Sequence, residues 1–239
     1  MEYHKKAALE LRSWQARMVK KPSFVGLFTK GIQKKVNSYI PEKIHKVITS
    51  SIKNMVHAVL SGSTYITKAP AIGLTFQEQE ELVKDKLNFY KKAAAAEGAG
   101  TGAGGFLLSL ADFPLLLSVE MKFLFEAAAG YGFDVKDYRE RLYILHIFQL
   151  AFASEVRRRL AYEHILHWDL RVEEFSRDIN DVDWRTFQQE YRDYIDIAKM
   201  FQMLPGIGAV VGAVANYRLL DTLGETAINC YRLRVLRPN

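Results

Sequence analysis

Residues 93–119 read AAAAEGAGTGAGGFLLSLADFPLLLSV, a glycine-rich tract followed by the most apolar run of the chain. Five glycines fall within the eight positions from Gly98 to Gly105. A glycine in a helix interior costs about 1 kcal/mol relative to alanine, so a cluster of glycines needs a physical reason. The usual reasons are a backbone that closely approaches another backbone or a ligand, or a positive φ angle.

A second small-residue tract, LPGIGAVVGAVAN, spans residues 204–216. Glycines recur at small-xxx-small spacing in both tracts, and this spacing favours close contact between helices. We therefore predict that the two tracts open helices that pack against each other, mostly away from water. The glycines assigned to this structural core are Gly98, Gly100, Gly102, Gly105, Gly208 and Gly212.

Helical periodicity covers most of the remaining sequence. A first helix is expected over residues 3–20, and a capping box from Thr75 to Glu78 begins the helix that leads into the first glycine tract. Asp134 follows a Tyr-Gly-Phe turn and is expected to cap a long helix over residues 135–170. Sustained alternation of apolar and polar residues is absent, as are Asn-Gly and Asp-Gly hairpin turns. The predicted fold class is all-α: a single-domain multi-helix bundle with two glycine-rich helix-opening tracts packed in its core.

The amino-acid composition excludes several classes of protein. The 239 residues are 49% hydrophobic, which excludes a disordered chain. The single cysteine, Cys230, cannot form an internal disulfide and is expected to be a small buried apolar residue. The first residues are charged and lack the apolar stretch of a secretory signal, so we expect no such signal.

Charge is distributed unevenly along the chain. Residues 1–54 hold twelve Lys and Arg against three Glu, a net charge of +9, and since the whole chain carries +6 the remainder carries −3. Basic residues interleaved with aromatic ones are typical of an interfacial membrane anchor. We divide the chain into a basic amphipathic segment at 1–40 and a helical domain at 41–239. The residues expected to contact an anionic membrane surface are Lys20, Lys21, Phe24, Phe28, Lys30, Lys34 and Lys35.

Two other interpretations of the basic segment stay open. An ordinary solvated surface would have the same charge. Nucleic acid binding is the competing interpretation, but the chain contains no recognisable reader motif, so nucleic acid is not expected as a partner. The apolar run from Gly98 to Val119 is a poor membrane span, since Asp112 and Pro114 lie inside it. A buried helical hairpin or a re-entrant segment accounts for it better.

The spacing of the glycines in the first tract also matches a nucleotide-binding motif. Residues 100–105 read GTGAGG and match G-x-G-x-x-G, but the dinucleotide fingerprint requires a preceding β-strand, and residues 91–97 are helical in character. The chain has neither a G-x-x-x-x-G-K-[ST] loop nor a G-x-S-x-G nucleophile elbow. We therefore expect no cofactor.

Three carboxylates and two histidines are the weak candidates for a reactive site. Asp112 lies among apolar residues, where a carboxylate must cap a helix, pair with a base or meet water. A functional Asp112 would take Glu120 or Glu126 as its partner. His164 and His167 share a helix face at i, i+3 spacing, but polar positions on an amphipathic helix explain them better than a metal site, and no metal is expected.

Four motifs carry a resemblance to a known family. They are EGAGTGAGGF at 97–106, ADFP at 111–114, YGFD at 131–134 and PGIGAVVGAVAN at 205–216. The chain resembles the EcsC family of bacterial proteins, named for a gene beside an ABC transporter, from about residue 40 to its end. The resemblance implies an accessory role with ABC transporter subunits, in the cytoplasm and peripheral to the inner membrane, and it supplies no catalytic residues.

The sequence thus predicts a non-enzymatic, membrane-associated accessory protein linked to an ABC transporter or to an envelope or lipid process. One alternative is a lipid-handling or hydrolytic enzyme with Asp112 in a pocket. The other alternative is a soluble interaction domain without membrane contact.

Overall fold

The structure is a computed structural model that describes residues 2–20, 42–62, 69–102, 113–172 and 209–236. These residues form helices and connecting turns and contain no β-strand, so the all-α prediction is confirmed. The described helices are α1 (Glu2–Met18), α3 (Glu42–Ser61), α4 (Phe76–Gly102), α6 (Phe113–Gly130), α7 (Tyr138–Ala151), α8 (Glu155–Leu166), α9 (Trp168–Arg171) and α12 (Ala209–Val235).

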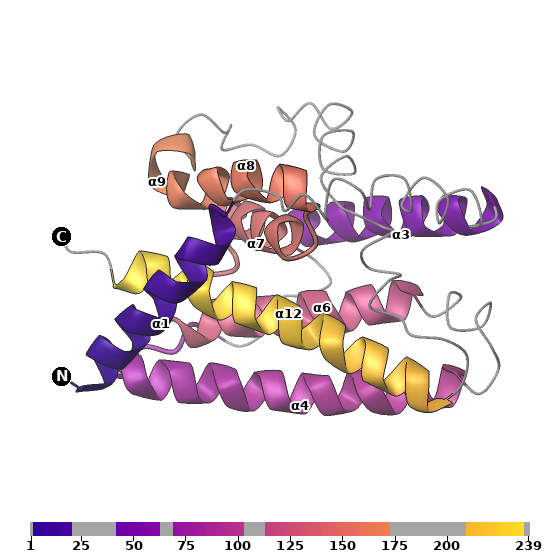
Figure 1. The fold of residues 1–239 in the computed structure, drawn as a ribbon, viewed down its shortest axis with the longest axis horizontal. Coiled ribbons are helices and arrows are strands. Elements are labelled where there is room, and N and C mark those ends of the chain that lie inside the picture. Colours follow the sequence, from indigo (N-terminus) through magenta and orange to yellow (C-terminus); the bar gives the residue numbers. More distant parts are fainter. Residues whose placement is uncertain (1, 21–41, 63–68, 103–112, 173–208, 237–239) are drawn as a thin grey trace.

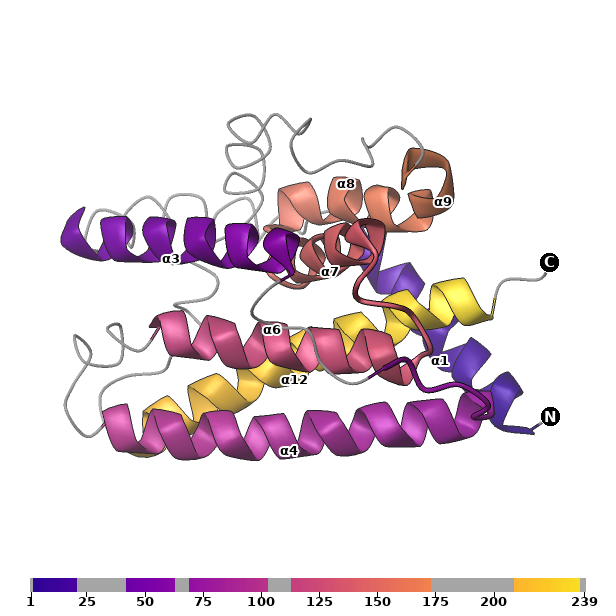
Figure 2. The ribbon, with the colours of Figure 1, turned by 180° about the vertical axis from the view of Figure 1, so that it is seen from behind.

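The helices form two layers (Figure 1). One layer contains α4, α6 and α12, and the other contains α3, α7, α8 and α9. Helix α1 crosses α12 near the carboxyl end of α12 (Figure 1). Seen from behind, α6 lies between α4 and the second layer, in contact with α3, α4, α7 and α12 (Figure 2). The buried side chains of α6 accordingly point in nearly every direction.

The most extensive contact in the bundle joins α4 to α12, the two helices that carry the small-residue tracts. They run antiparallel, because later residues of α4 meet earlier residues of α12. Arg232 binds Glu80, Lys91 binds Asp221, and the Asn216 amide donates to the carbonyl of Ala94 at 3.1 Å. Two small-residue helices therefore pack together as expected, but the partner of α12 is α4, which ends in the first tract, and the helix that follows this tract, α6, contacts α12 less extensively.

The structure refines where the first glycine tract lies. Helix α4 continues through Gly98, Gly100 and Gly102, so these three glycines end a helix, whereas the sequence analysis expected the tract to open one. Gly98 is buried, and Gly212 lies within the first turns of α12. Gly105 and Gly208 lie outside the described residues. The structural role of the tract glycines as a group stays a prediction.

Two glycines that the sequence analysis did not single out mark the closest helix contacts. A Cβ atom at Gly224 of α12 would lie 2.3 Å from Leu87 Cδ2 of α4. A Cβ atom at Gly130, the last residue of α6, would lie 2.7 Å from Val83 Cγ2. Carbon atoms do not approach this closely, so both positions require glycine as long as the neighbouring side chain stays in place.

The capping box before α4 is confirmed. The Thr75 amide donates to Glu78 Oε2 at 2.7 Å, and the Glu78 amide donates to Thr75 Oγ1 at 3.4 Å. The bonds from the backbone and side chain of Thr75 lower the pKa of Glu78. The turn expected at Tyr131–Phe133 is also present, and Gly132 adopts a φ angle of +86° that favours glycine.

The single long helix predicted over residues 135–170 is wrong, because the chain forms α7, α8 and α9 there. Asp134 does not cap α7; its carboxylate accepts from the Lys136 amide, while Asp137 is the N-cap and accepts from the Arg139 amide at 2.8 Å. Ser154 then caps α8. Such side chains compete for backbone amides and favour helix starts, which explains why the chain breaks here.

Candidate functional site

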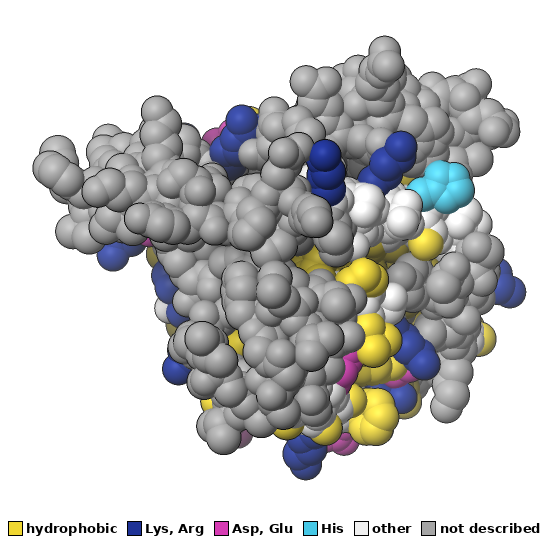
Figure 3. All heavy atoms as spheres, turned by 90° about the vertical axis from the view of Figure 1, so that its right-hand side faces the viewer, with side chains coloured by type: hydrophobic (Ala, Val, Ile, Leu, Met, Phe, Trp, Pro, Cys, Tyr) yellow, Lys and Arg dark blue, Asp and Glu magenta, His cyan; other side chains and the backbone are white. Residues whose placement is uncertain are grey.

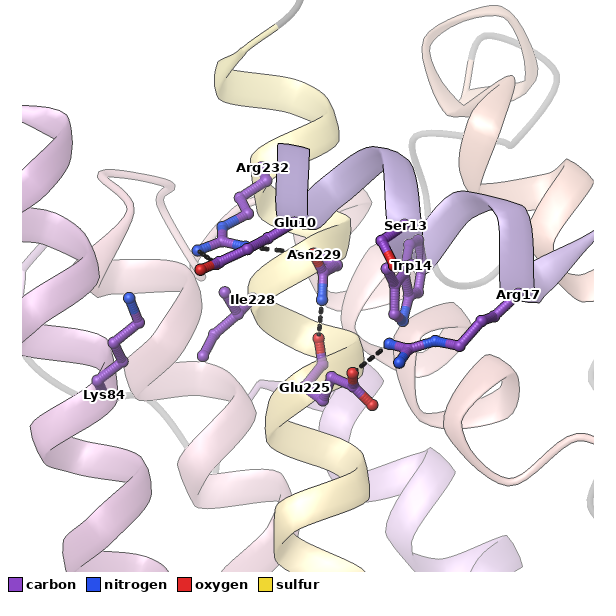
Figure 4. A pocket seen from close by; sticks show the side chains of 9 residues that line it. All are labelled: Glu10, Ser13, Trp14, Arg17, Lys84, Glu225, Ile228, Asn229 and Arg232. Carbon is purple, nitrogen blue, oxygen red and sulfur yellow. Dashed lines mark hydrogen bonds and ion pairs between the residues drawn. The ribbon is translucent and has the colours of Figure 1, made fainter. Parts of the chain in front are cut away.

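A polar pocket of about 360 Å³ lies between α1, α4 and α12 (Figure 4). Helix α1 supplies four of its lining residues, α12 supplies another four, and Lys84 projects from α4 on the opposite side. The lining residues are Glu10, Ser13, Trp14, Arg17, Lys84, Glu225, Ile228, Asn229 and Arg232. Neither Glu120 nor Glu126 lines this pocket, and Asp112 lies outside the described residues.

The inner end of the pocket is an ion pair between Glu80 and Arg232, both almost completely buried. Arg232 binds both carboxylate oxygens of Glu80, through Nε to Oε1 and through Nη2 to Oε2 at 2.8 Å. The Tyr3 hydroxyl and the Lys84 ammonium also donate to Oε2, at 2.7 and 3.0 Å. Burial favours a raised pKa for Glu80, but the hydrogen bonds from these donors outweigh burial and lower its pKa to about 2.

Helix α1 closes the pocket and is held in place by the same network. Glu10 binds Arg232 Nη2 at 2.8 Å, Arg17 binds Glu225, and the Gln15 amide donates to the Tyr162 hydroxyl at 3.0 Å. On the same side of α1, Ala7, Leu11 and Trp14 are buried. Each charged side chain that lines the pocket therefore has an oppositely charged partner. The arrangement fixes the position of α1, and its carboxylates are engaged as ion-pair acceptors.

A second buried network joins the carboxyl end of α12 to α7. The Tyr231 hydroxyl and Arg234 Nη1 donate to the two carboxylate oxygens of Glu140, at 2.8 and 2.7 Å. The Arg234 guanidinium also lies 3.7 Å from the centroid of the Phe133 ring. Burial raises the pKa of Glu140, and Arg234 opposes part of that rise. This network is structural, because every charged group in it is satisfied.

The structure separates the two carboxylates proposed as partners of Asp112. Glu120 is completely buried, and neither of its oxygens has a hydrogen-bond partner among the described residues. Burial raises its pKa to about 8. Glu126 instead accepts from the Tyr90 hydroxyl at 2.8 Å and binds Lys86 at 2.9 Å. Six positions apart on α6, the two side chains point in different directions, while Asp112 lies outside the described residues.

The two histidines considered as metal ligands have different surroundings. His164 packs edge-on against the buried His146 ring, with centroids 5.7 Å apart, while His167 is exposed and ends α8. Burial lowers the pKa of His146 to about 3, so this imidazole is neutral at pH 7. The described part of the chain brings no third metal-binding side chain to this pair.

Of the residues expected to contact a membrane, the described part of the chain includes only Lys20, which is exposed just beyond α1. Lys21, Phe24, Phe28, Lys30, Lys34 and Lys35 lie outside it. No described helix combines the length and the apolar character needed to cross a bilayer.

Sequence reasoning missed Glu80 and Arg232, which organise the pocket. A signal for Glu80 was present, because it falls on the buried stripe of α4 with Phe76, Val83 and Leu87. A carboxylate at such a position needs a partner. The sequence did not indicate which residue this partner is, since Arg232 lies 152 residues away.

Comparisons with known proteins cover nearly the whole chain. The model of the EcsC protein family matches residues 5–236, which extends the similarity into α1. The chain is 50% identical over 229 residues to "Protein EcsC" of Bacillus subtilis (strain 168), covering 95% of this chain and 94% of that protein. It is 30% identical over 215 residues to the "Uncharacterized protein YdbA" of the same strain, covering 81% and 79% of the two chains. No solved structure matches. A match of this extent, over the helices that build the pocket as well as the glycine tracts, means that the chain belongs to the EcsC family.

Proposed function

We propose that the protein is a non-enzymatic accessory protein that binds peripherally to an anionic membrane surface on the cytoplasmic side. The observation that carries the proposal is the net charge of +9 within residues 1–54 of a chain whose remainder is acidic. Each basic residue close to an anionic leaflet contributes about 1 kcal/mol of binding free energy. The described basic residues of this segment are exposed: Lys5, Lys6, Arg12, Arg17, Lys20, Lys46 and Lys53.

Vesicle flotation tests this proposal. The protein should float with vesicles that contain phosphatidylglycerol and stay unbound with phosphatidylcholine alone. Substitution of Lys20, Lys21, Lys30, Lys34 and Lys35 by Gln should weaken the binding. Equal recovery in the unbound fraction for both lipids would show that the protein does not bind anionic membranes. Point substitutions are preferable to deleting residues 1–40, because a deletion would also remove the buried Trp14 and Leu11 of α1.

We propose an ABC transporter subunit as the protein partner, on the basis of family membership. An exposed apolar surface supports a partner of this kind. Figure 3 shows hydrophobic side chains beside lysines and arginines at the end of the molecule where α4 ends and α12 begins. Exposed apolar residues on α6 and α12 include Leu115, Val214 and Tyr217. Co-purification of the tagged protein with the transporter from solubilised membranes tests this partner, and a Leu115→Glu, Tyr217→Glu variant should lose it.

A lipid-handling or hydrolytic enzyme is the second candidate function, and Glu120 is the observation that favours it. A buried carboxyl group with a pKa near 8 can donate a proton at neutral pH. Asp112→Asn should then abolish lipid hydrolysis while the thermal midpoint is retained, and Glu120→Gln should abolish it without lowering the thermal midpoint. Wild-type protein without activity towards lipid esters would reject this candidate.

A further inference from the structure

Helix α1 has two different faces. The inner face carries the buried residues Ala7, Leu11 and Trp14, together with Glu10, which binds Arg232. Together with Tyr3, which binds Glu80, these contacts fix the rotation of α1 about its own axis. The opposite side of the helix must therefore face solvent.

That opposite side combines basic residues with an exposed leucine. Leu9 is 65% exposed, and Lys5, Lys6 and Arg12 are its neighbours at i−4, i−3 and i+3 on the same helix surface. We call these four residues the outer α1 face. None of its three cations makes an ion pair or a hydrogen bond with another described residue, in contrast to Arg17 on the inner side. Glu2 is the acidic residue next to this face, so the local net charge is +2.

The outer α1 face lies within the basic segment at 1–40, and exposed residues follow it along the chain. Val19, 50% exposed, and the exposed Lys20 follow directly after the end of α1. Long basic side chains beside an isolated aliphatic one suit a lipid interface, because their charged ends reach the headgroups while the leucine enters the acyl boundary. Nucleic acid would bind the basic side chains through its phosphates, but it would not account for the exposed apolar side chains of Leu9 and Val19.

We propose that the outer α1 face is a preformed contact for acidic phospholipids, with Lys5, Lys6 and Arg12 on the headgroup phosphates and Leu9 inserted between them. This inference rests on the proposed membrane function and adds a folded lipid-binding surface to it. The Glu80–Arg232 network, which holds the inner face of α1, orients the surface.

A matched pair of triple variants tests the assignment. The outer-face variant is Lys5→Gln, Lys6→Gln, Arg12→Gln, and the control is Lys92→Gln, Lys122→Gln, Lys136→Gln, which removes the same charge from exposed positions elsewhere. On vesicles with phosphatidylglycerol, the outer-face variant should lose about fivefold in partitioning per charge, or on the order of 100-fold in total, and the control far less. Circular dichroism and thermal midpoints should show both variants folded.

The outcomes separate this inference from the proposed function. Wild-type protein that fails to float would reject membrane binding and this inference together. Wild-type protein that floats while both triple variants lose binding equally would overturn the outer α1 face and leave the proposed function standing. An outer-face variant that still floats like the wild type but no longer binds duplex DNA or RNA would assign the face to nucleic acid.

A fluorescent probe tests the insertion of Leu9 directly. The native Cys230 is completely buried, so an environment-sensitive dye should label Leu9→Cys selectively. Its emission should shift to the blue on anionic vesicles. The control is Leu115→Cys, which is 52% exposed in the first turn of α6, and this helix begins at the end of the bundle away from α1 (Figure 2). No shift at residue 9, or an equal shift at both positions, would contradict insertion through α1.

Discussion

At the scale of single residues, two buried glutamates in this bundle have pKa values that are shifted in opposite directions. Glu80 and Glu120 are both completely buried on helices, but only Glu80 has donors around it. As a result, the pKa of Glu80 is lowered to about 2, whereas burial raises the pKa of Glu120 to about 8. The same residue type therefore stabilises the fold in one place and weakens it in another, depending on pH.

Glu80→Ala should lower the free energy of unfolding by about 3–5 kcal/mol at pH 7, because it leaves the buried Arg232 without its main partner. A lowered folded-state pKa means that Glu80 stabilises the fold above its unfolded pKa and loses this effect as the pH falls through about 4.5 towards 2. Urea unfolding at pH 7 and pH 3 measures both effects. Glu81→Ala, at the exposed neighbouring position, is the control and should change stability by less than about 0.5 kcal/mol.

Glu120→Gln should remove a pH-dependent loss of stability. The raised pKa means that the folded state keeps a proton which the unfolded state releases, so the wild type loses stability as the pH rises from about 4.5 to about 8. Each unit of pKa difference corresponds to about 1.4 kcal/mol, so the gain over the wild type should reach several kcal/mol at pH 8. Thermal midpoints of the two proteins at pH 5 and pH 8 check this, and a constant difference across that range would contradict it.

At the scale of helices, local sequence patterns predicted where helices form, but they did not predict which residues make the closest contacts between helices. The capping box at Thr75–Glu78 predicted the start of α4, since both partners lie within one turn. The residues that admit a neighbouring helix are Gly130 and Gly224, which stand alone in the sequence. Clustered glycines, as in the two tracts, indicate close packing in the sequence. A single glycine such as Gly130 or Gly224 does not indicate which side chain packs against it.

Gly224→Ala should destabilise the α4–α12 contact by about 1–3 kcal/mol, because the new methyl group overlaps Leu87. The higher helix propensity of alanine offsets about 1 kcal/mol of this loss. A double-mutant cycle with Leu87→Ala, measured by urea unfolding, provides the control. The alanine at 224 should be tolerated better when Leu87 is shortened, and additive effects would contradict direct overlap.

At the scale of the whole molecule, the polar pocket connects α1 to the central helices α4 and α12. Its ion pairs orient α1 so that the outer α1 face is exposed. The basic segment and the folded bundle are therefore joined by a helix that belongs to both. The lipid contact that we propose for the outer α1 face depends on this arrangement, because α1 must keep its orientation in the bundle.

Salt should weaken the proposed membrane contact strongly. The screening length falls from about 10 Å at 0.1 M salt to about 3 Å at 1 M, so the attraction of exposed lysines to an anionic leaflet decreases. Flotation with anionic vesicles should therefore drop steeply between 0.1 and 1 M NaCl, while the buried Glu80–Arg232 pair keeps the fold intact. Binding that does not change with salt would indicate apolar insertion as the main contribution.

The sequence by itself determined the all-α class, the capping box and the family, because periodicity, caps and motifs are local or repeated signals. Only the tertiary structure decided which buried carboxylate is paired, where the pocket lies and which face of α1 is left exposed. Arg232 is 152 residues from Glu80 and Glu225 is 208 residues from Arg17. Such pairs arise when helices pack, so no local pattern predicts them.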